Sequence, residues 1–212
     1  MFSLEKVKFK NILEIDSLEF PNNKVTTIIG PSGAGKSTLL KLLNNMVSVD
    51  SGTLLYKGQD INQLNPVELR REVIMLAQNP VIFTGTIKDN LEIAFRLREE
   101  SAPKEEELKE ILKVVHLNKE LTDNAERLSG GEKQRLSLAR VLILNPKVVL
   151  LDEPSSALDQ ETERLVIETV VNYVKNKDKT LIMITHSKDI ALKYGDKIIT
   201  LEEGSVLREE EN

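Results

Sequence analysis

Residues 30–38 have the types and spacing of a phosphate-binding loop, in which two glycines flank four residues and precede a lysine and a serine. The nine residues are Gly30, Pro31, Ser32, Gly33, Ala34, Gly35, Lys36, Ser37 and Thr38. Glycines let backbone N–H groups turn inward around phosphate oxygens, and a following helix adds partial positive charge. We expect Lys36 to bridge the β- and γ-phosphates of a nucleotide and Ser37 to ligate Mg²⁺. A plain glycine-rich turn is the alternative, but the strand pattern before the loop and the helical pattern after it favour phosphate binding.

A second element of such a site lies where the apolar run 148–151 ends in two acids, Asp152 and Glu153. A buried strand that ends in carboxylates places them at the carboxyl edge of a sheet, where ligands bind in open α/β folds. We expect Asp152 to hold Mg²⁺ and Glu153 to orient or deprotonate an attacking water. Without the phosphate-binding loop, the pair would be interpreted as exposed acids at a strand end.

The segment 128–135 reads Leu-Ser-Gly-Gly-Glu-Lys-Gln-Arg. Ser129 and Glu132, three residues apart, predict a helix start with a capping box. Capping does not require Gly130 and Gly131, each of which costs a helix about 1 kcal/mol relative to alanine. The two glycines are explained if another group, such as an anion, approaches the bare start of this helix.

Short runs rich in β-branched residues predict the strands that position these groups. They are apolar on both faces, which is typical of a parallel sheet that is covered on both sides. Helical spacing follows Lys36, and Asn65 with Pro66 predicts another helix start, so strands and helices alternate as in an α/β fold. The predicted strands are residues 25–29, 73–76, 148–151 and 181–184.

Both ends of the chain depart from this alternation. The apolar pattern up to residue 20 predicts short antiparallel strands. Residues 197–201, followed by a turn at Glu203 and Gly204, predict a hairpin. The acidic tail 208–212 is expected to fray.

The middle of the chain, residues 79–145, carries a mainly helical pattern without a clear strand. We therefore expect one domain, 1–212, in which a helical subdomain is inserted at about 79–145 into an α/β core made of 1–78 and 146–212.

Composition and charge narrow the classes of function. The chain has 212 residues with 34 acidic and 29 basic side chains, and its net charge of −5 argues against a nucleic-acid partner. With no cysteine and only two histidines, we expect neither disulfides nor a thiolate or histidine-rich metal site. The apolar runs are far shorter than the roughly 20 residues of a membrane span, and the first residues lack the apolar region of a signal peptide. We expect a cytoplasmic chain.

These segments together resemble the motifs of the ATP-binding cassette (ABC) ATPases, in the order of that family and across almost the whole chain. The segment 128–134 is similar to the family's signature motif. Gln78 resembles the Q-loop glutamine, Ser156 and Asp159 lie in a segment similar to the D-loop, and His186 resembles the switch histidine. Gln78 or His186 alone would be interpreted as a surface residue after a strand.

The resemblance implies a P-loop NTPase (RecA-like) core with a mainly parallel sheet, an N-terminal antiparallel β subdomain and an inserted α-helical subdomain. It also implies ATP and Mg²⁺ as cofactors and a head-to-tail homodimer that closes when ATP binds. Gln78 would sense Mg²⁺ and the attacking water, His186 would hold the γ-phosphate, and Glu153 and Lys36 complete the catalytic set. The signature residues that would contact ATP in trans are Ser129, Gly130, Gly131, Glu132 and Gln134.

Within this family the chain resembles subunits that drive transport. Chromosome-maintenance and repair members carry long coiled coils, but no sustained heptads separate Gln78 from Ser129. Translation-type members carry two cassettes, and a small P-loop kinase would lack the signature segment. We expect an ATPase subunit that is peripheral on the cytoplasmic face of the cell membrane and has a separate transmembrane permease as its partner.

The segment 78–91 is similar to the Q-loop region of ABC exporters, which in that family forms a groove for a coupling helix of the membrane subunit. Val81, Ile82 and Phe83 would supply apolar contacts to that helix. The alternative is that these three are core residues of the helical subdomain. The segment 122–127 lacks the glycines that full exporters carry before the signature.

The short length and the segments 51–55 and 156–160 resemble the ATPase subunit of a bacterial iron-export system. Lipoprotein-release and peptide-export ATPases, and small importer subunits, are alternatives, because substrate choice resides in the membrane subunit.

Many family members stack an aromatic residue on adenine, but here Phe9 is expected to be a core strand residue. His116 is expected to be a surface or partly packed histidine.

Overall fold

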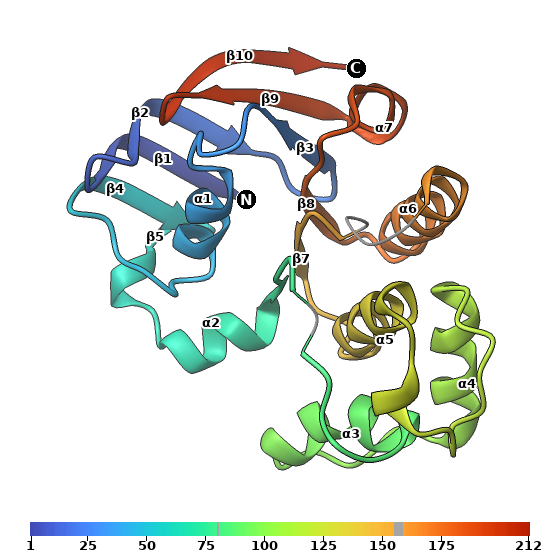
Figure 1. Cartoon of the computed structure of the whole chain (residues 1–212). Helices are drawn as coiled ribbons and strands as arrows, with labels where there is room; N and C mark the ends of the chain where they lie inside the picture. Colours follow the sequence, from blue (N-terminus) through green and yellow to red (C-terminus); the bar gives the residue numbers. More distant parts are fainter. Residues whose placement is uncertain (80, 155–158) are drawn as a thin grey trace.

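The computed structural model describes residues 1–79, 81–154 and 159–212, and Figure 1 shows two sheets with helices around them. The first sheet has four strands in the order β2-β1-β4-β5, with antiparallel pairing throughout. Its strands are β1 Phe2–Phe9, β2 Leu13–Phe20, β4 Ser51–Tyr56 and β5 Gln59–Asp60. Apolar side chains of β1 and β2 face inward while their charged neighbours face solvent, and the predicted antiparallel N-terminal strands are therefore confirmed.

The second sheet has six strands in the order β10-β9-β3-β8-β7-β6. Neighbouring strands from β9 to β6 are parallel, and β10 pairs antiparallel with β9. The predicted parallel sheet and the C-terminal hairpin are thus confirmed. The strands are β3 Val25–Ile29, β6 Val73–Leu76, β7 Val148–Asp152, β8 Thr180–Ile184, β9 Lys197–Glu202 and β10 Ser205–Glu211.

Strands β7 and β8 are buried on both faces because each face lies in a different core. Val149 and Leu151 of β7 pack in a cluster with the helices that follow residue 87. Val148 and Leu150 of the same strand pack in a second cluster with α1 and the antiparallel sheet. A strand with two buried faces has no solvent side, so its sequence is a continuous apolar run.

Three of the helices, α3, α4 and α5, gather away from the antiparallel sheet (Figure 1). The described residues of 79–145 contain no β-strand, and the β-type pairing among them is one isolated bridge between Thr86 and Asn124. No helix in the described residues is both long enough and apolar enough to span a membrane. The helices are α1 Lys36–Leu43, α2 Pro66–Glu72, α3 Ile87–Leu97, α4 Glu105–Val114, α5 Gly130–Ile143, α6 Gln160–Lys175 and α7 Lys188–Tyr194, with 3₁₀ turns at Ile61–Gln63 and Ala125–Arg127.

The acidic tail does not fray, and the expectation that it would is wrong. β10 continues to Glu211, whose partner on β9 is Lys197. The side-chain amide of Asn212 donates hydrogen bonds to the carbonyls of Leu192 and Gly195, both at 3.0 Å. Backbone pairing along the sheet edge holds the tail despite its charge, and the Lys197 ammonium pairs with Glu209 at 2.5 Å.

Glu72, the last residue of α2, joins three segments of the core. Its carboxylate accepts hydrogen bonds from the Tyr56 hydroxyl at 3.0 Å, the Lys57 ammonium at 2.7 Å and the Lys147 ammonium at 2.5 Å. Burial by itself would raise the pKa of Glu72, but the bonds from Lys147, Lys57 and Tyr56 outweigh it and lower the pKa to about 2. The ionised form therefore stabilises the junction between β4, α2 and the start of β7.

Glu72→Gln should lower the free energy of unfolding at neutral pH by about 1 kcal/mol, because the ion pairs are partly exposed and screened. The pKa of Glu72 in the folded protein lies below its ordinary value of 4.5. The stabilisation by ionised Glu72 is therefore present above pH 4.5 and is lost as the pH falls toward about 2. Urea denaturation at neutral pH and at about pH 3 measures the difference between the two proteins, which should shrink at the lower pH. An equal difference at both pH values would contradict this assignment.

Candidate nucleotide-binding site

The phosphate-binding loop joins the end of β3 to the start of α1, which is the predicted strand–loop–helix setting. Gly30 has a φ of 148°, and a Cβ added to it would lie 2.0 Å from the Leu201 carbonyl oxygen of β9. The Lys36 ammonium lies back over the loop and donates hydrogen bonds to the carbonyls of Gly30 and Pro31, both at 2.8 Å. Burial lowers the pKa of Lys36, although the nearby carboxylates of Glu153 and Asp152 oppose this shift. A phosphate anion at the loop would favour the charged ammonium.

Ser37 and Asp152, predicted as the magnesium ligands, are in contact. The Ser37 hydroxyl donates a hydrogen bond to the Asp152 carboxylate at 2.9 Å. Burial raises the pKa of Asp152, and the hydrogen bond from Ser37 partly offsets this. A hydroxyl and a carboxylate oxygen side by side fit Mg²⁺, which prefers oxygen ligands and takes one or two protein carboxylates together with substrate phosphates. The described residues include no group of three or more acids, histidines or cysteines that could hold a metal alone.

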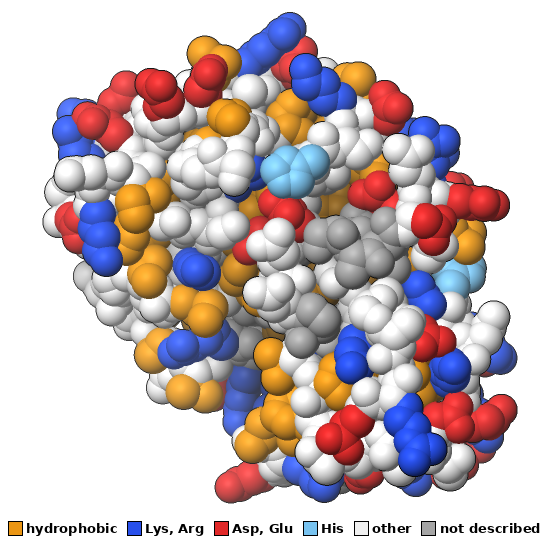
Figure 2. Space-filling model, in the orientation of Figure 1, with side chains coloured by type: hydrophobic (Ala, Val, Ile, Leu, Met, Phe, Trp, Pro, Cys, Tyr) orange, Lys and Arg blue, Asp and Glu red, His pale blue; other side chains and the backbone are white. Residues whose placement is uncertain are grey.

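Glu153, next to Asp152, is the meeting point of three predicted residues. Its carboxylate accepts a hydrogen bond from the Gln78 amide at 2.6 Å and lies 2.7 Å from the Nε2 atom of His186. Its carbonyl accepts a hydrogen bond from the Gln134 amide at 3.3 Å. Glu153 has a φ of 49°, a backbone conformation that costs energy in a residue other than glycine. Acidic side chains beside a histidine are visible in the middle of the face in Figure 2.

Strand order explains why these residues meet. Gln78 follows β6, Glu153 follows β7 and His186 follows β8, and these strands are neighbours in the sheet. The carboxyl ends of parallel strands lie at one edge, which is where α/β folds bind ligands. The side chain of His186 is 56% exposed, so its ring has room to turn toward a ligand.

The signature segment begins α5 as predicted. The Ser129 hydroxyl accepts a hydrogen bond from the Glu132 backbone N–H at 3.3 Å, and the Glu132 carboxylate accepts one from the Ser129 N–H at 2.8 Å. Apart from its chain neighbours and the backbone of its own helix, no heavy atom of the described residues lies within 4 Å of a Cβ added to Gly130. Among the hydrogen bonds and ion pairs of the described chain, none joins residues 129–132 to the loop 30–38. Within the described residues, these two predicted half-sites are therefore not bonded to each other.

Of the two predicted D-loop residues, Ser156 and Asp159, the structure describes Asp159. Asp159 caps α6, since its carboxylate accepts hydrogen bonds from the Thr162 backbone N–H at 3.0 Å and the Thr162 hydroxyl at 2.7 Å. The bond from the Thr162 backbone is the main cause that lowers the pKa of Asp159. Ser156 lies outside the described residues.

The residues that follow Gln78 split between the two interpretations of the sequence. Val81 and Phe83 are exposed, at 60% and 37%, whereas Ile82 packs against the core formed with the helices. The core alternative is thus correct for Ile82 and wrong for the other two. Phe9 and His116 are as expected, because Phe9 is buried and the His116 ring is a partly packed partner of Thr169 at 2.9 Å.

Two polar residues that the sequence analysis missed hold this segment. Asn90 of α3 is fully buried, and its side chain bonds both the N–H and the carbonyl of Phe83 at 2.8 Å. Arg140 of α5 donates a hydrogen bond to the Val81 carbonyl at 2.6 Å and lies 5.0 Å from the centre of the Phe83 ring. Asn90 could have been found, because it shares an apolar helix face with Ile87 as a lone polar residue.

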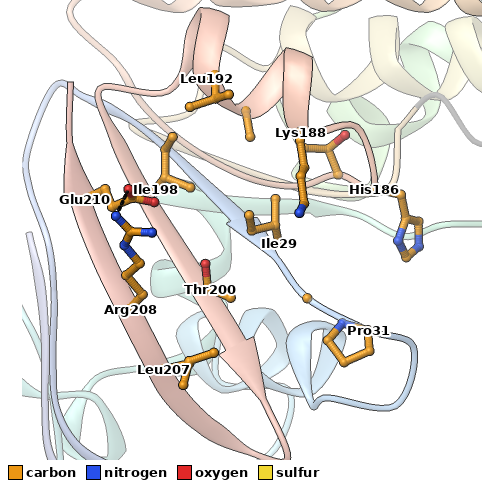
Figure 3. Close-up of a pocket in the computed structure, with 13 residues that line it drawn as sticks. Ile29, Pro31, His186, Lys188, Leu192, Ile198, Thr200, Leu207, Arg208 and Glu210 are labelled. Atoms are coloured by element: carbon orange, nitrogen blue, oxygen red, sulfur yellow. Dashed lines mark ion pairs between the residues drawn. The ribbon is translucent and has the colours of Figure 1, made fainter.

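A cavity of about 510 Å³ opens beside the start of the phosphate-binding loop. Figure 3 shows Pro31 and His186 at one end and the Arg208–Glu210 ion pair at the other, with Ile198 and Thr200 of β9 between them. His186 therefore borders both the carboxylate of Glu153 and an open space.

Known proteins resemble this chain over most of its length. The "ABC transporter" family model matches residues 13–156. The "Probable iron export ATP-binding protein FetA" of Escherichia coli (strain K12) is 42% identical over 175 residues, which cover 82% of this chain and 77% of that protein. The "Phosphate import ATP-binding protein PstB" of Saccharolobus solfataricus is 38% identical over 213 residues, which cover 93% and 81%.

A solved dimeric ATP-binding cassette in a post-hydrolysis state, bound to ADP and Pi, has a TM-score of 0.86 to this chain at 27% identity. The likeness covers 100% of this chain and 98% of that one. Fold and site thus define an ATP-binding cassette ATPase with the P-loop NTPase fold. The chain belongs to the ABC transporter family as an ATP-binding subunit.

The two glycines at positions 30 and 130 should respond differently to alanine. Gly30→Ala should lower the free energy of unfolding by about 3 kcal/mol, because the new Cβ would overlap the backbone of β9. Gly130→Ala should change it by no more than about 1 kcal/mol, since the site is open and alanine favours a helix. Denaturant unfolding of both variants checks the contrast, and equal destabilisation would contradict it.

Proposed function

We propose that this chain hydrolyses ATP as a homodimer that closes on ATP binding and drives transport through a separate transmembrane permease. The observation that supports this most is the convergence of Gln78 and His186 on Glu153, beside the Ser37–Asp152 pair. The chain would lie on the cytoplasmic face of the membrane, as family membership suggests. No nucleic-acid partner is proposed, in keeping with the net charge of −5.

The residues of one copy would bind and activate the nucleotide. Lys36 would exchange the two loop carbonyls for the β- and γ-phosphates, while Ser37 and Asp152 would hold Mg²⁺, which neutralises phosphate charge when bound. Glu153 would orient a water and accept its proton as the water oxygen attacks the γ-phosphorus and the bond to ADP breaks. Gln78 would position that water and the metal, and His186 would donate a hydrogen bond to the γ-phosphate.

The second copy would supply the signature. Among the hydrogen bonds and ion pairs of the described residues, none joins the helix start at Ser129 and Gly131 to the loop of its own chain, and packing does not require glycine at position 130. A γ-phosphate bound in the other copy would accept hydrogen bonds from the Ser129 hydroxyl and the Gly131 N–H at this helix start. The similarity to a dimeric cassette bound to ADP and Pi supports this arrangement.

The exposed pair Val81 and Phe83 is proposed as the contact for the membrane subunit. Iron export is the proposed role, on the similarity to FetA, with peptide or lipoprotein export as alternatives. An import role is a further alternative, because a phosphate importer subunit is similar over a larger share of this chain. The short helices α3 and α4 do not form the long coiled coil of non-transport members.

Glu153→Gln should bind ATP but hydrolyse it at least about 100-fold more slowly, because the amide cannot accept a proton. The variant should accumulate as an ATP-bound dimer, which light scattering with and without ATP measures. A variant that stays monomeric at high protein and ATP concentration would contradict the dimer model. A small-molecule kinase would instead transfer phosphate to an acceptor, so the release of inorganic phosphate by the parent protein separates the two classes.

Val81→Asp combined with Phe83→Asp should abolish co-purification with the membrane permease, because charge would replace the apolar contact. ATP binding should be retained, since neither side chain lies in the phosphate-binding loop. Leu165→Asp combined with Leu192→Asp, which places the same two charges on exposed leucines of α6 and α7, serves as the matched control. Co-purification that survives the double substitution would reject this docking site.

A further inference from the structure

The signature helix carries a carboxylate close to where the proposed function brings a triphosphate. Glu132 lies in the first turn of α5, directly after Gly130 and Gly131. An unpaired negative charge there would repel the phosphates of ATP held by the other copy. The inference that follows rests on the proposed function, since it concerns how this charge is managed.

Both oxygens of the Glu132 carboxylate are already engaged. One oxygen accepts the hydrogen bond from the Ser129 backbone N–H at 2.8 Å, and the other lies 3.2 Å from the Lys119 ammonium. The Ser129 bond is the main cause that lowers the pKa of Glu132. The group therefore stays ionised at neutral pH, and its charge is balanced by pairing and not by protonation.

Lys119 reaches Glu132 from another segment, the loop that follows α4. The Lys119 backbone N–H donates to the Leu117 carbonyl at 3.0 Å, and the next residues are tied to α3 by a hydrogen bond from Lys88 to Leu121 at 2.9 Å. The side chains of Lys119 and Glu132 are 36% and 22% exposed. In the described part of the chain, Lys119 is the one cation within ion-pair distance of Glu132.

We propose that Lys119 is a positioning residue for the trans ATP contact. Its ammonium balances the negative charge of Glu132 and keeps that carboxylate hydrogen-bonded to the Ser129 N–H. The γ-phosphate of the other copy would then approach Ser129 and Gly131 without repulsion from an unpaired carboxylate. The loop after α4 is thereby part of the ATP-induced dimer interface. Lys119 touches neither the reacting atoms nor the magnesium ligands, so its effect is on dimer closure.

The test measures ATP-driven dimerisation in the Glu153→Gln background by sedimentation at a fixed ATP concentration. Lys119→Met should weaken the dimer about tenfold, because it leaves Glu132 facing the phosphates. Lys119→Arg should restore affinity to within about twofold, since it keeps the charge. Lys113→Met is the matched control, because Lys113 pairs with Glu110 on α4 and its loss changes the net charge equally.

A double-substitution cycle separates charge compensation from a general structural effect. With Glu132→Gln present, Lys119→Met should weaken the dimer by less than about twofold, since no carboxylate remains to compensate. The same weakening in both backgrounds, or a Lys119→Met effect no larger than that of Lys113→Met, would overturn the inference and leave the proposed function intact. If the Glu153→Gln protein with no further substitution does not dimerise with ATP, the proposed function is contradicted, and this inference with it.

Discussion

The nucleotide site depends on one geometric constraint, the shared carboxyl edge of the neighbouring parallel strands β6, β7 and β8. Each strand is followed within two residues by a polar side chain, and the strand order brings Gln78, Glu153 and His186 within hydrogen-bonding distance. Glu153 occupies a left-handed backbone conformation to reach both partners. Its carboxylate and carbonyl make contacts with Gln78, His186 and Gln134, which hold this sparsely populated conformation in place.

The same edge connects to the exposed apolar pair through a very short piece of chain. Gln78 is bonded to Glu153 at the carboxyl edge of the parallel sheet, whereas the Val81 carbonyl is bonded to Arg140 on α5. The other end of α5 carries the signature glycines. Only three positions of sequence thus separate a residue of the proposed catalytic set from the proposed membrane contact.

Electrostatics favour the ligands that the motifs predict. Burial weakens the charged forms of both Lys36 and Asp152, and among the described residues each has neutral hydrogen-bond partners. A phosphate beside Lys36 and a divalent cation beside Asp152 would restore the charges. Lys36 and Asp152 are thus two buried ionisable groups whose charged forms a magnesium nucleotide would stabilise.

Local features of this protein follow from the sequence alone: the phosphate-binding loop, the capping box at Ser129 and the doubly apolar strands. Each is decided by residues a few positions apart, so spacing and period suffice to predict it. Only the tertiary structure decides that Gln78 meets Glu153 across 75 positions, that Asn90 and Arg140 hold the segment at 81–83, and that the acidic tail pairs as a strand. These outcomes depend on which distant elements pack together, because a buried polar group must find its partner wherever the fold places one.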